Sequence, residues 1–475
     1  MSSTRAIAHN TIIQIAGKAI SVFLGLIAIG MMTRYLGQEK FGWYVTAITF
    51  LQFACILIDF GLIPVTAQML SEPEHDKTRL LKNLLSYRFF TALVCLAIAP
   101  LIAMFFPYPV EVKIAIAFST ISFLSVAMNQ IFTGFYQTKL KMHIQVMGEL
   151  VGRVILVAGL YLLIKNHSQF LPIMAAIVIS SVSYTAVMWI SASRETSIGF
   201  GFDWTIWRAI TKKMWPIALA IIFNVIYLKG DIILLSLFRP QAEVGLYGAA
   251  YRVIDIYSQL AMMIMGILLP FLAFNWSRNL LTEFRKHYQQ SFDIIMLMAV
   301  PVLVATLILA EKMMRLVAGS DFVAAGKPLQ ILSLAVFGVY LGAVFGHTAV
   351  AINRQKQILW IFISDAIITL VGYLIFIPKF GMCGAAWMTV FSELYAGILL
   401  FASTRYYSKV ALQLKTFGKI ILASLIMGFV LLAFIKLNVL LLALIGAIVY
   451  GACLLLFKAI SKETIREIFS SRQKS

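Results

Sequence analysis

Charged residues are scarce in this 475-residue chain. Asp, Glu, Lys and Arg together make up 12% of it, whereas hydrophobic residues make up 61% and the mean hydropathy is +0.91. A soluble protein of this length could not bury so much apolar surface, so the composition excludes an ordinary soluble domain and predicts a polytopic membrane protein.

Acidic residues are rarer than basic ones, with 20 Asp and Glu against 39 Lys and Arg. No aromatic-and-basic motif of an RNA-binding or DNA-binding module accompanies this excess, so we expect no nucleic acid partner. We expect the basic residues to lie in cytoplasmic loops and to contact membrane lipids with anionic headgroups.

Motifs of cofactor and metal chemistry are also missing from the sequence. The four cysteines lie in apolar runs without a C-x-x-C spacing, which argues against disulfides and zinc. Neither a G-x-x-x-x-G-K-[ST] phosphate loop nor an H-E-x-x-H helix occurs. No large outer loop presents paired carboxylates, as a membrane glycosyltransferase or ligase would need. We therefore expect a protein that is not an enzyme and that needs no cofactor or metal.

Long hydrophobic runs are abundant, and a membrane span needs about 20 mostly apolar residues. The sequence predicts an all-α protein with fourteen transmembrane helices. The predicted spans are 10–33, 42–69, 82–106, 112–136, 144–164, 171–192, 213–238, 244–274, 290–310, 327–352, 357–378, 382–404, 416–435 and 438–457. The first run is too long for a signal-peptide core and is expected to be retained.

Basic residues in the loops predict the orientation. With the N-terminus in the cytoplasm, the inner segments carry 24 Lys and Arg and the outer segments carry 10. This bias predicts that both termini lie in the cytoplasm.

Short internal echoes indicate a duplicated architecture. Residues 245–251 read GLYGAAY and residues 381–387 read GMCGAAW, and each opens a predicted span after a short turn. The segment EKFGWY at 39–44 resembles EVGLY at 243–247. Such small residues let helices approach closely in lipid. Two six-helix lobes and a final helix pair follow as a prediction: 1–195, 196–412 and 413–475.

The longest connection, residues 193–212, joins the two predicted lobes and mixes tryptophans with basic residues. Either an interfacial helix along the inner headgroups or a plain linker fits this pattern.

Basic residues inside predicted spans are the strongest functional signal, because ionisable groups in a membrane are costly. Lys18 lies about 12 Å from the inner end of its span and has no acid three or four positions away. Its partner must come from another helix, from water or from a ligand, and Asp59 is one candidate. Arg88 is shallower and could also reach the inner headgroups. Together with Arg252, these residues predict a positively charged cavity that attracts an anionic substrate.

Other charges in spans leave two interpretations open. Glu149 and Arg153, four residues apart, can pair on one helix face. Arg252 and Asp255 can pair with each other, or they can line a cavity near the bilayer centre.

The remaining intramembrane charges are less constrained by their spacing. Lys229 and Asp231 lie two residues apart and cannot pair directly on a helix, and Lys229 can snorkel to the outer surface. Asp365 and Glu393 either pair with each other or couple transport to an ion.

Several segments resemble the Wzx-type polysaccharide and O-antigen flippases of the multidrug/oligosaccharidyl-lipid/polysaccharide exporter superfamily. They are NTIIQIAGK, TRYLGQEKFGWY, DFGLIPV and PKFGMCGAAWMTVFSE. The resemblance implies two lobes around a central cavity and alternating access. It also implies export of an undecaprenyl-pyrophosphate-linked oligosaccharide across the cytoplasmic membrane for surface polysaccharide biosynthesis.

The resemblance also implies which residues act. Spans 1, 2, 7 and 8 would line the cavity, and they carry Lys18, Asp59, Lys229, Asp231, Arg252 and Asp255. Lys18 and Arg252, with Arg88, are the candidates for binding the diphosphate, and Asp59, Asp365 and Glu393 are candidates for coupling to H⁺ or Na⁺. A polysaccharide polymerase and glycosyltransferases are the expected protein partners.

Two other functions fit the sequence less well. An ion-coupled multidrug antiporter of the same superfamily would want acidic cavity walls and twelve helices, whereas a membrane scaffold would need no intramembrane charges. The basic surplus and the two extra spans favour the flippase.

Overall fold

A computed structural model describes residues 3–56, 62–71 and 76–459, and these residues form helices joined by short turns. The helices are α1 (Ser3–Ile56), α2 (Leu62–Ser71), α3 (Lys77–Met104), α4 (Val110–Thr138), α5 (Met142–Lys165), α6 (Phe170–Ser193), α7 (Trp204–Phe238), α8 (Gln241–Ser277), α9 (Leu281–Ala318), the short 3₁₀ helix η1 (Ser320–Ala325), α10 (Gly326–Ala351), α11 (Leu359–Ser408), α12 (Lys415–Ala433) and α13 (Val439–Leu456). The prediction of an all-α fold is confirmed.

Within the described ranges, 11 helices are long and apolar enough to cross a membrane. Two of them, α1 with 54 residues and α11 with 50, are far longer than the roughly 20 residues that one span needs. Each contains a glycine with positive φ, Gly37 (φ 68°) in α1 and Gly381 (φ 57°) in α11. This left-handed conformation breaks the helix at the places where the sequence predicts a turn between two spans. The chain is a multi-pass membrane protein.

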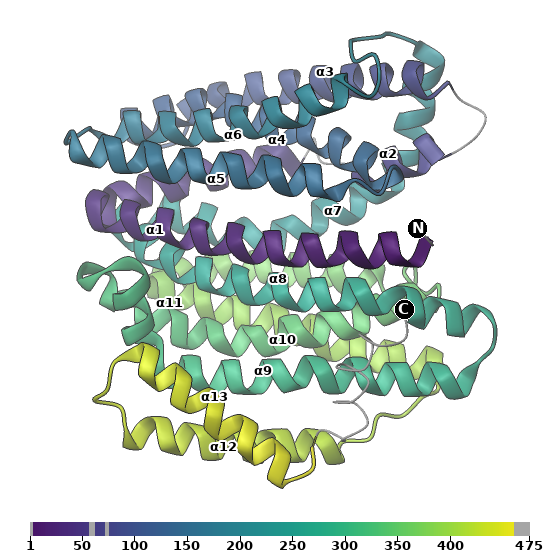
Figure 1. The fold of residues 1–475 in the computed structure, drawn as a ribbon. Coiled ribbons are helices and arrows are strands. Elements are labelled where there is room, and N and C mark those ends of the chain that lie inside the picture. The colour runs from purple at the N-terminus through teal and green to yellow at the C-terminus, as the bar shows by residue number, and fades with distance from the viewer. Residues whose placement is uncertain (1–2, 57–61, 72–75, 460–475) are drawn as a thin grey trace. The chain divides into compact units, whose positions relative to one another are not determined.

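Residues 1–245 form one compact unit. In it, α4, α5 and α6 lie side by side and α3 packs on α4 (Figure 1). Helix α7 packs against α1, α2 and α3. An apolar core that includes Leu84, Phe132, Met188 and Met214 joins α3, α4, α6 and the beginning of α7.

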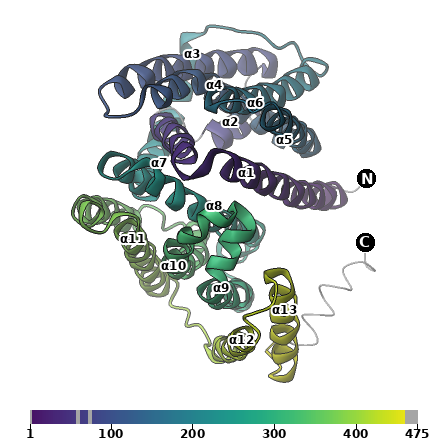
Figure 2. The ribbon, with the colours of Figure 1, turned by 90° about the vertical axis from the view of Figure 1, so that its left-hand side faces the viewer.

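Residues 246–475 form a second compact unit. Its centre is the packing of α10 against α11 and α9. Helices α12 and α13 pack against each other and against α9 (Figure 2), through a small core that includes Leu309, Met427, Leu431 and Leu442. The lobe boundaries at 195 and 412 stay a prediction, because the division at residue 245 follows compactness alone.

The small residues of the repeated segments allow close helix contact. A Cβ atom on Gly245 would lie 2.1 Å from the carbonyl oxygen of Gln38, and one on Gly42 would lie 1.8 Å from the carbonyl oxygen of Gln241. Within the first unit, residues 241–245 therefore touch the second half of α1 backbone to backbone. Only glycine permits this approach.

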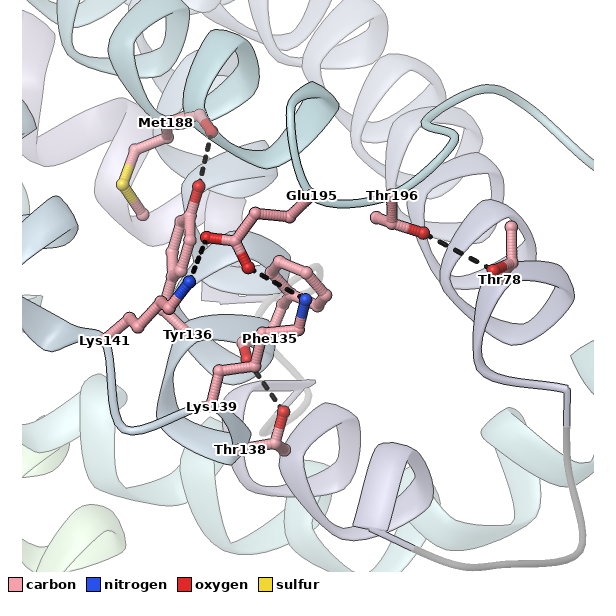
Figure 3. Close-up of polar contacts among 9 residues, drawn as sticks. All are labelled: Thr78, Phe135, Tyr136, Thr138, Lys139, Lys141, Met188, Glu195 and Thr196. Atoms are coloured by element: carbon pink, nitrogen blue, oxygen red, sulfur yellow. Dashed lines mark hydrogen bonds and ion pairs between the residues drawn. The ribbon is translucent and has the colours of Figure 1, made fainter. Parts of the chain in front are cut away.

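The connection between α6 and α7 is tied to the first unit by polar contacts (Figure 3). The Glu195 carboxylate accepts hydrogen bonds from Lys139 and Lys141, both at 2.9 Å, and so joins the connection to the turn between α4 and α5. Arg79 of α3 pairs with Asp203 at 2.6 Å. Residues 204–212 belong to α7 itself, so residues 194–203 are a linker held against the helices rather than a separate interfacial helix.

Asp203 also begins α7, because its side chain accepts from the backbone N–H groups of Thr205 and Ile206. Partial desolvation opposes the charged form, but these hydrogen bonds and Arg79 outweigh it and hold the pKa of Asp203 below its usual value. Two interactions of Asp203 therefore hold the end of the linker: the N-cap hydrogen bonds to α7 and the ion pair with Arg79 of α3.

Candidate functional site

Lys18 forms an ion pair with an acid from another helix. Its Nζ lies 3.3 Å from Oε1 of Glu149, which α5 contributes, and α1 packs directly against α5. The lysine side chain is 38% exposed and the glutamate 21% exposed. The sequence left three kinds of partner open for Lys18: a residue of another helix, water or a ligand. The structure shows the first of these. Asp59, the acid named as a candidate, lies outside the described residues.

A second cation stands beside this ion pair. Ser21, one turn after Lys18 on α1, donates a hydrogen bond of 2.6 Å to Glu149 Oε1. The Nε atom of Arg153 donates to the Ser21 hydroxyl at 3.4 Å. In the part of the chain that the structure describes, Glu149 thus pairs with Lys18, and Arg153 is joined to the pair through Ser21. Among the described residues, the expected i,i+4 pair of Glu149 with Arg153 is not formed. Glu149 instead contacts Lys18 and Ser21, because α1 packs close to α5.

This cluster of Lys18, Ser21, Glu149 and Arg153, hereafter the α1–α5 cluster, contains two cations and one carboxylate. Its formal charge is therefore positive. Lys18, Ser21 and Glu149 lie on helices that are apolar enough to span a membrane, where a charge is stable only with partners or water around it. An anion that entered the cluster would meet two cations, Lys18 from α1 and Arg153 from α5.

Arg88 is buried inside the first unit. Its side chain is 2% exposed and donates from Nε to the carbonyl oxygen of Ala127 at 3.3 Å, and from Nη2 to the Gln130 side chain. Both acceptors belong to α4, so the guanidinium ties α3 to α4. This burial does not favour direct contact with headgroups or substrate in the conformation described.

Arg252 and Asp255 pair along α8 in the second unit. Their closest atoms, Nη1 and Oδ2, are 3.7 Å apart, and their side chains are 27% and 28% exposed. The structure thus shows the i,i+3 pair, which is one of the two interpretations that the sequence left open. Asp231, in α7 of the first unit, is fully buried and accepts from the backbone N–H of Ile232, whereas Lys229 is half-buried.

Asp365 is fully buried in the second unit and joins the two halves of α11. Its Oδ1 accepts from Thr369 at 3.0 Å and its Oδ2 accepts from Ser392 at 2.9 Å. Glu393 is 8% exposed and follows Ser392 directly. Hydroxyl groups therefore donate the hydrogen bonds of Asp365. Pairing of Asp365 with Glu393 was one of the two expectations, and the hydrogen bonds found are not with the Glu393 carboxyl.

Sequence reasoning missed the uncharged polar partners. Ser21, Gln130, Thr369 and Ser392 each bond a charged residue, and Ser and Thr are too common in membrane helices to attract notice. A positional signal was available for two of them. Ser21 lies three residues after Lys18, and Thr369 lies four after Asp365, so each shares a helix face with the charge. Among the described residues, no group of three His, Cys, Asp or Glu is placed to hold a metal ion.

Comparison with solved structures identifies the fold. The chain matches the lipid II flippase MurJ in an inward closed conformation with a TM-score of 0.77 and 17% identity, covering 97% of this chain and 99% of that one. It also matches the inward-facing conformation of a multidrug resistance MATE transporter of the MOP superfamily with a TM-score of 0.69 and 13% identity, covering 82% and 94%. At these identities the likeness establishes the fold alone: the chain has the MOP superfamily fold.

A comparison with curated proteins finds a flippase. The chain is 24% identical over 196 residues to the probable low-salt glycan biosynthesis flippase Agl15 of Haloferax volcanii. The match covers 41% of this chain and 42% of that protein, so it spans less than half of either.

The family described as "Polysaccharide biosynthesis protein" matches residues 7–276, more than half of the chain. The matched region contains the whole α1–α5 cluster, Arg88 and Arg252. The chain belongs to this polysaccharide biosynthesis protein family.

Proposed function

We propose that the protein is a transporter, not an enzyme, and that it flips a lipid-linked oligosaccharide across the cytoplasmic membrane for surface polysaccharide biosynthesis. Membership of a polysaccharide biosynthesis family, the fold of a lipid II flippase and the partial likeness to a glycan flippase all support it. The substrate that fits best is an oligosaccharide on undecaprenyl diphosphate, moved by alternating access with both termini in the cytoplasm.

The α1–α5 cluster is the observation that carries this proposal. A polar, net-positive group of side chains on apolar helices is expensive in lipid, and Lys18 remains 38% exposed within it. Among the components of a lipid-linked glycan, only the diphosphate is strongly anionic, so it is the part that lysine and arginine would bind. In the second unit, Arg252 is a separate candidate for binding the diphosphate, and it pairs with Asp255.

A coupling ion is part of the proposal. Asp365 is a buried carboxylate whose oxygens are held by two hydroxyls, an arrangement of oxygen atoms that can take a proton or a Na⁺ ion. An Asp365→Asn variant would then transport without coupling or not at all. The assay is glycan-lipid flipping in proteoliposomes with and without an imposed H⁺ or Na⁺ gradient. Gradient-dependent transport by D365N would remove Asp365 from this role.

The multidrug antiporter remains the second candidate, because the MATE fold covers 82% of this chain. The net-positive α1–α5 cluster weighs against cationic drugs, which would be repelled by it. Efflux of cationic dyes from cells that express the protein would favour this candidate over the flippase.

The decisive experiment compares the double variant Lys18→Ala, Arg252→Ala with a control double variant, Lys113→Ala, Arg315→Ala. The control removes one lysine and one arginine at helix ends outside the proposed sites. In cells that lack the native gene, the control should restore surface glycan. The test variant should reach the membrane in equal amount but leave lipid-linked glycan on the cytoplasmic face. Normal glycan export by a correctly inserted test variant would refute the proposal.

A further inference from the structure

We propose that Glu149 is an exchangeable internal anion, and that it holds the place that the substrate's diphosphate takes between Lys18 and Arg153. The inference rests on the proposed flippase function and extends it. It assigns Arg153 as a second cation of the binding site and Glu149 as the group that sets the affinity of that site for anions.

The geometry of the cluster supports a placeholder role for Glu149. Both Lys18 and Ser21 reach the same carboxylate oxygen, Oε1, at 3.3 and 2.6 Å. Within the described part of the chain, no residue donates to the other oxygen of Glu149. A carboxylate that served only structure would be expected to use both oxygens in a membrane helix. The protein donors thus hold Glu149 at one oxygen only, Oε1.

Ser21 connects the two cations through one hydroxyl group. It donates its hydrogen to Glu149 Oε1 and accepts from Arg153 Nε. A hydroxyl has one hydrogen and two acceptor sites, so the same group can donate to a phosphate oxygen in place of the carboxylate. The arginine contact is long, at 3.4 Å, and it uses only the Nε–H group, so the Nη groups could donate to an incoming acceptor.

Charge balance explains why an exchange would be favourable. With Glu149 in place, two cations face one negative charge. A diphosphate carries more negative charge and more acceptor oxygens than a carboxylate, and arginine binds phosphate in a bidentate manner. Without any anion, two positive charges would remain on membrane helices, which is costly. Glu149 therefore stabilises the empty site while competing with the substrate for it.

Accessibility completes the argument. Lys18 and Glu149 are 38% and 21% exposed, so the ion pair is open on one side rather than sealed within the unit. Arg88, by contrast, is 2% exposed, and its Nε and Nη2 atoms donate to acceptors on α4. The exposed cluster can exchange its anion, whereas Arg88 cannot without unpacking α3 from α4.

The test measures binding of geranylgeranyl diphosphate to the full-length protein in nanodiscs. Glu149→Gln keeps the shape of the side chain and removes the competing charge, so its Kd should fall about tenfold, whereas Arg153→Gln should raise the Kd about tenfold. Glu243→Gln is the matched control, because Glu243 also pairs with a basic residue, Arg239, and has a similar exposure of 18%. Its Kd should equal that of the wild type.

A second measurement uses the wild-type protein, so that it does not depend on the folding of a variant. A carbodiimide should couple Lys18 to Glu149 because their charged atoms are 3.3 Å apart. Mass spectrometry of the cross-linked peptides would report the yield. Geranylgeranyl diphosphate should lower that yield severalfold, whereas sulfate at the same ionic strength should not.

The outcomes separate the two proposals. If the wild type binds the diphosphate and Lys18→Ala weakens binding, but E149Q binds no more tightly than the wild type, the placeholder role is wrong and the flippase proposal stands. The same holds if the probe leaves the cross-link yield unchanged. If the wild type binds no diphosphate at all, the proposed function fails and this inference fails with it.

Discussion

The two ion pairs of Glu195 hold the α6–α7 linker, and their exposure gives an estimate of the free energy that they contribute. Glu195 accepts one hydrogen bond from Lys139 and one from Lys141, each 2.9 Å long (Figure 3). The carboxylate is 17% exposed, but the two lysines are 36% and 45% exposed, so each ion pair is close to a surface pair and contributes about 0.7 kcal/mol. Glu195→Gln should therefore lower the free energy of opening the linker by about 1.4 kcal/mol.

The assay is hydrogen exchange of the linker amides in the purified protein. The N–H groups of Thr196 and Gly201 are bonded to Ala192 O and Ser86 Oγ, and they should exchange about tenfold faster in the E195Q variant at pH 7. Lys139→Gln, which leaves Lys141 in place, should produce roughly half of that change in free energy. Helix α10, which lies in the other unit, serves as the internal control and should be unaffected.

The pH dependence provides a second readout of the same contact. Partial burial raises the pKa of Glu195, but the hydrogen bonds and charges of Lys139 and Lys141 outweigh it and hold the pKa below the ordinary value of 4.5. The stabilisation is therefore present in full above pH 4.5 and is lost as the pH falls through the lower folded-state pKa. Wild-type linker exchange, corrected for its intrinsic rate, should approach that of E195Q only in this acidic range. Equal protection of both proteins at pH 7 would refute the reasoning.

Three further predictions concern stability and are checked by thermal unfolding in detergent. Gly381→Ala forces a side chain into a φ of 57° and should cost about 1–2 kcal/mol, whereas Gly418→Ala, in an open helical position, should be neutral or slightly stabilising. Ser392→Ala removes one of the two hydroxyls that bond Asp365 and should cost about 1–3 kcal/mol; a Tm equal to that of the wild type would show that water replaces it. Arg88→Ala leaves two α4 acceptors and a buried volume without their partner and should cost about 3 kcal/mol, so an unchanged Tm would contradict the structural role of Arg88.

Much of the fold follows from the sequence, because the lipid environment restricts it so strongly. A bilayer permits helices of a fixed minimum length, so hydrophobic runs predict spans directly. Even the two breaks inside α1 and α11 fall at glycines that the sequence places between predicted spans, Gly37 and Gly381. The pairing of Arg252 with Asp255 was one of two expectations, because residues three apart share a helix face, and the structure shows this pair.

The partners of the other charges were decided by tertiary structure. Lys18 and Glu149 are 131 residues apart, and no local spacing relates them. Glu149 had a suitable partner at i+4 in Arg153, yet the close packing of α1 on α5 supplies Lys18 and Ser21 instead. Helix spacing says which residues share a face, but only packing says what that face meets. The sequence thus determined where the chain crosses the membrane and which charges it carries there, and the packing of one helix on another decided which of those charges neutralise each other.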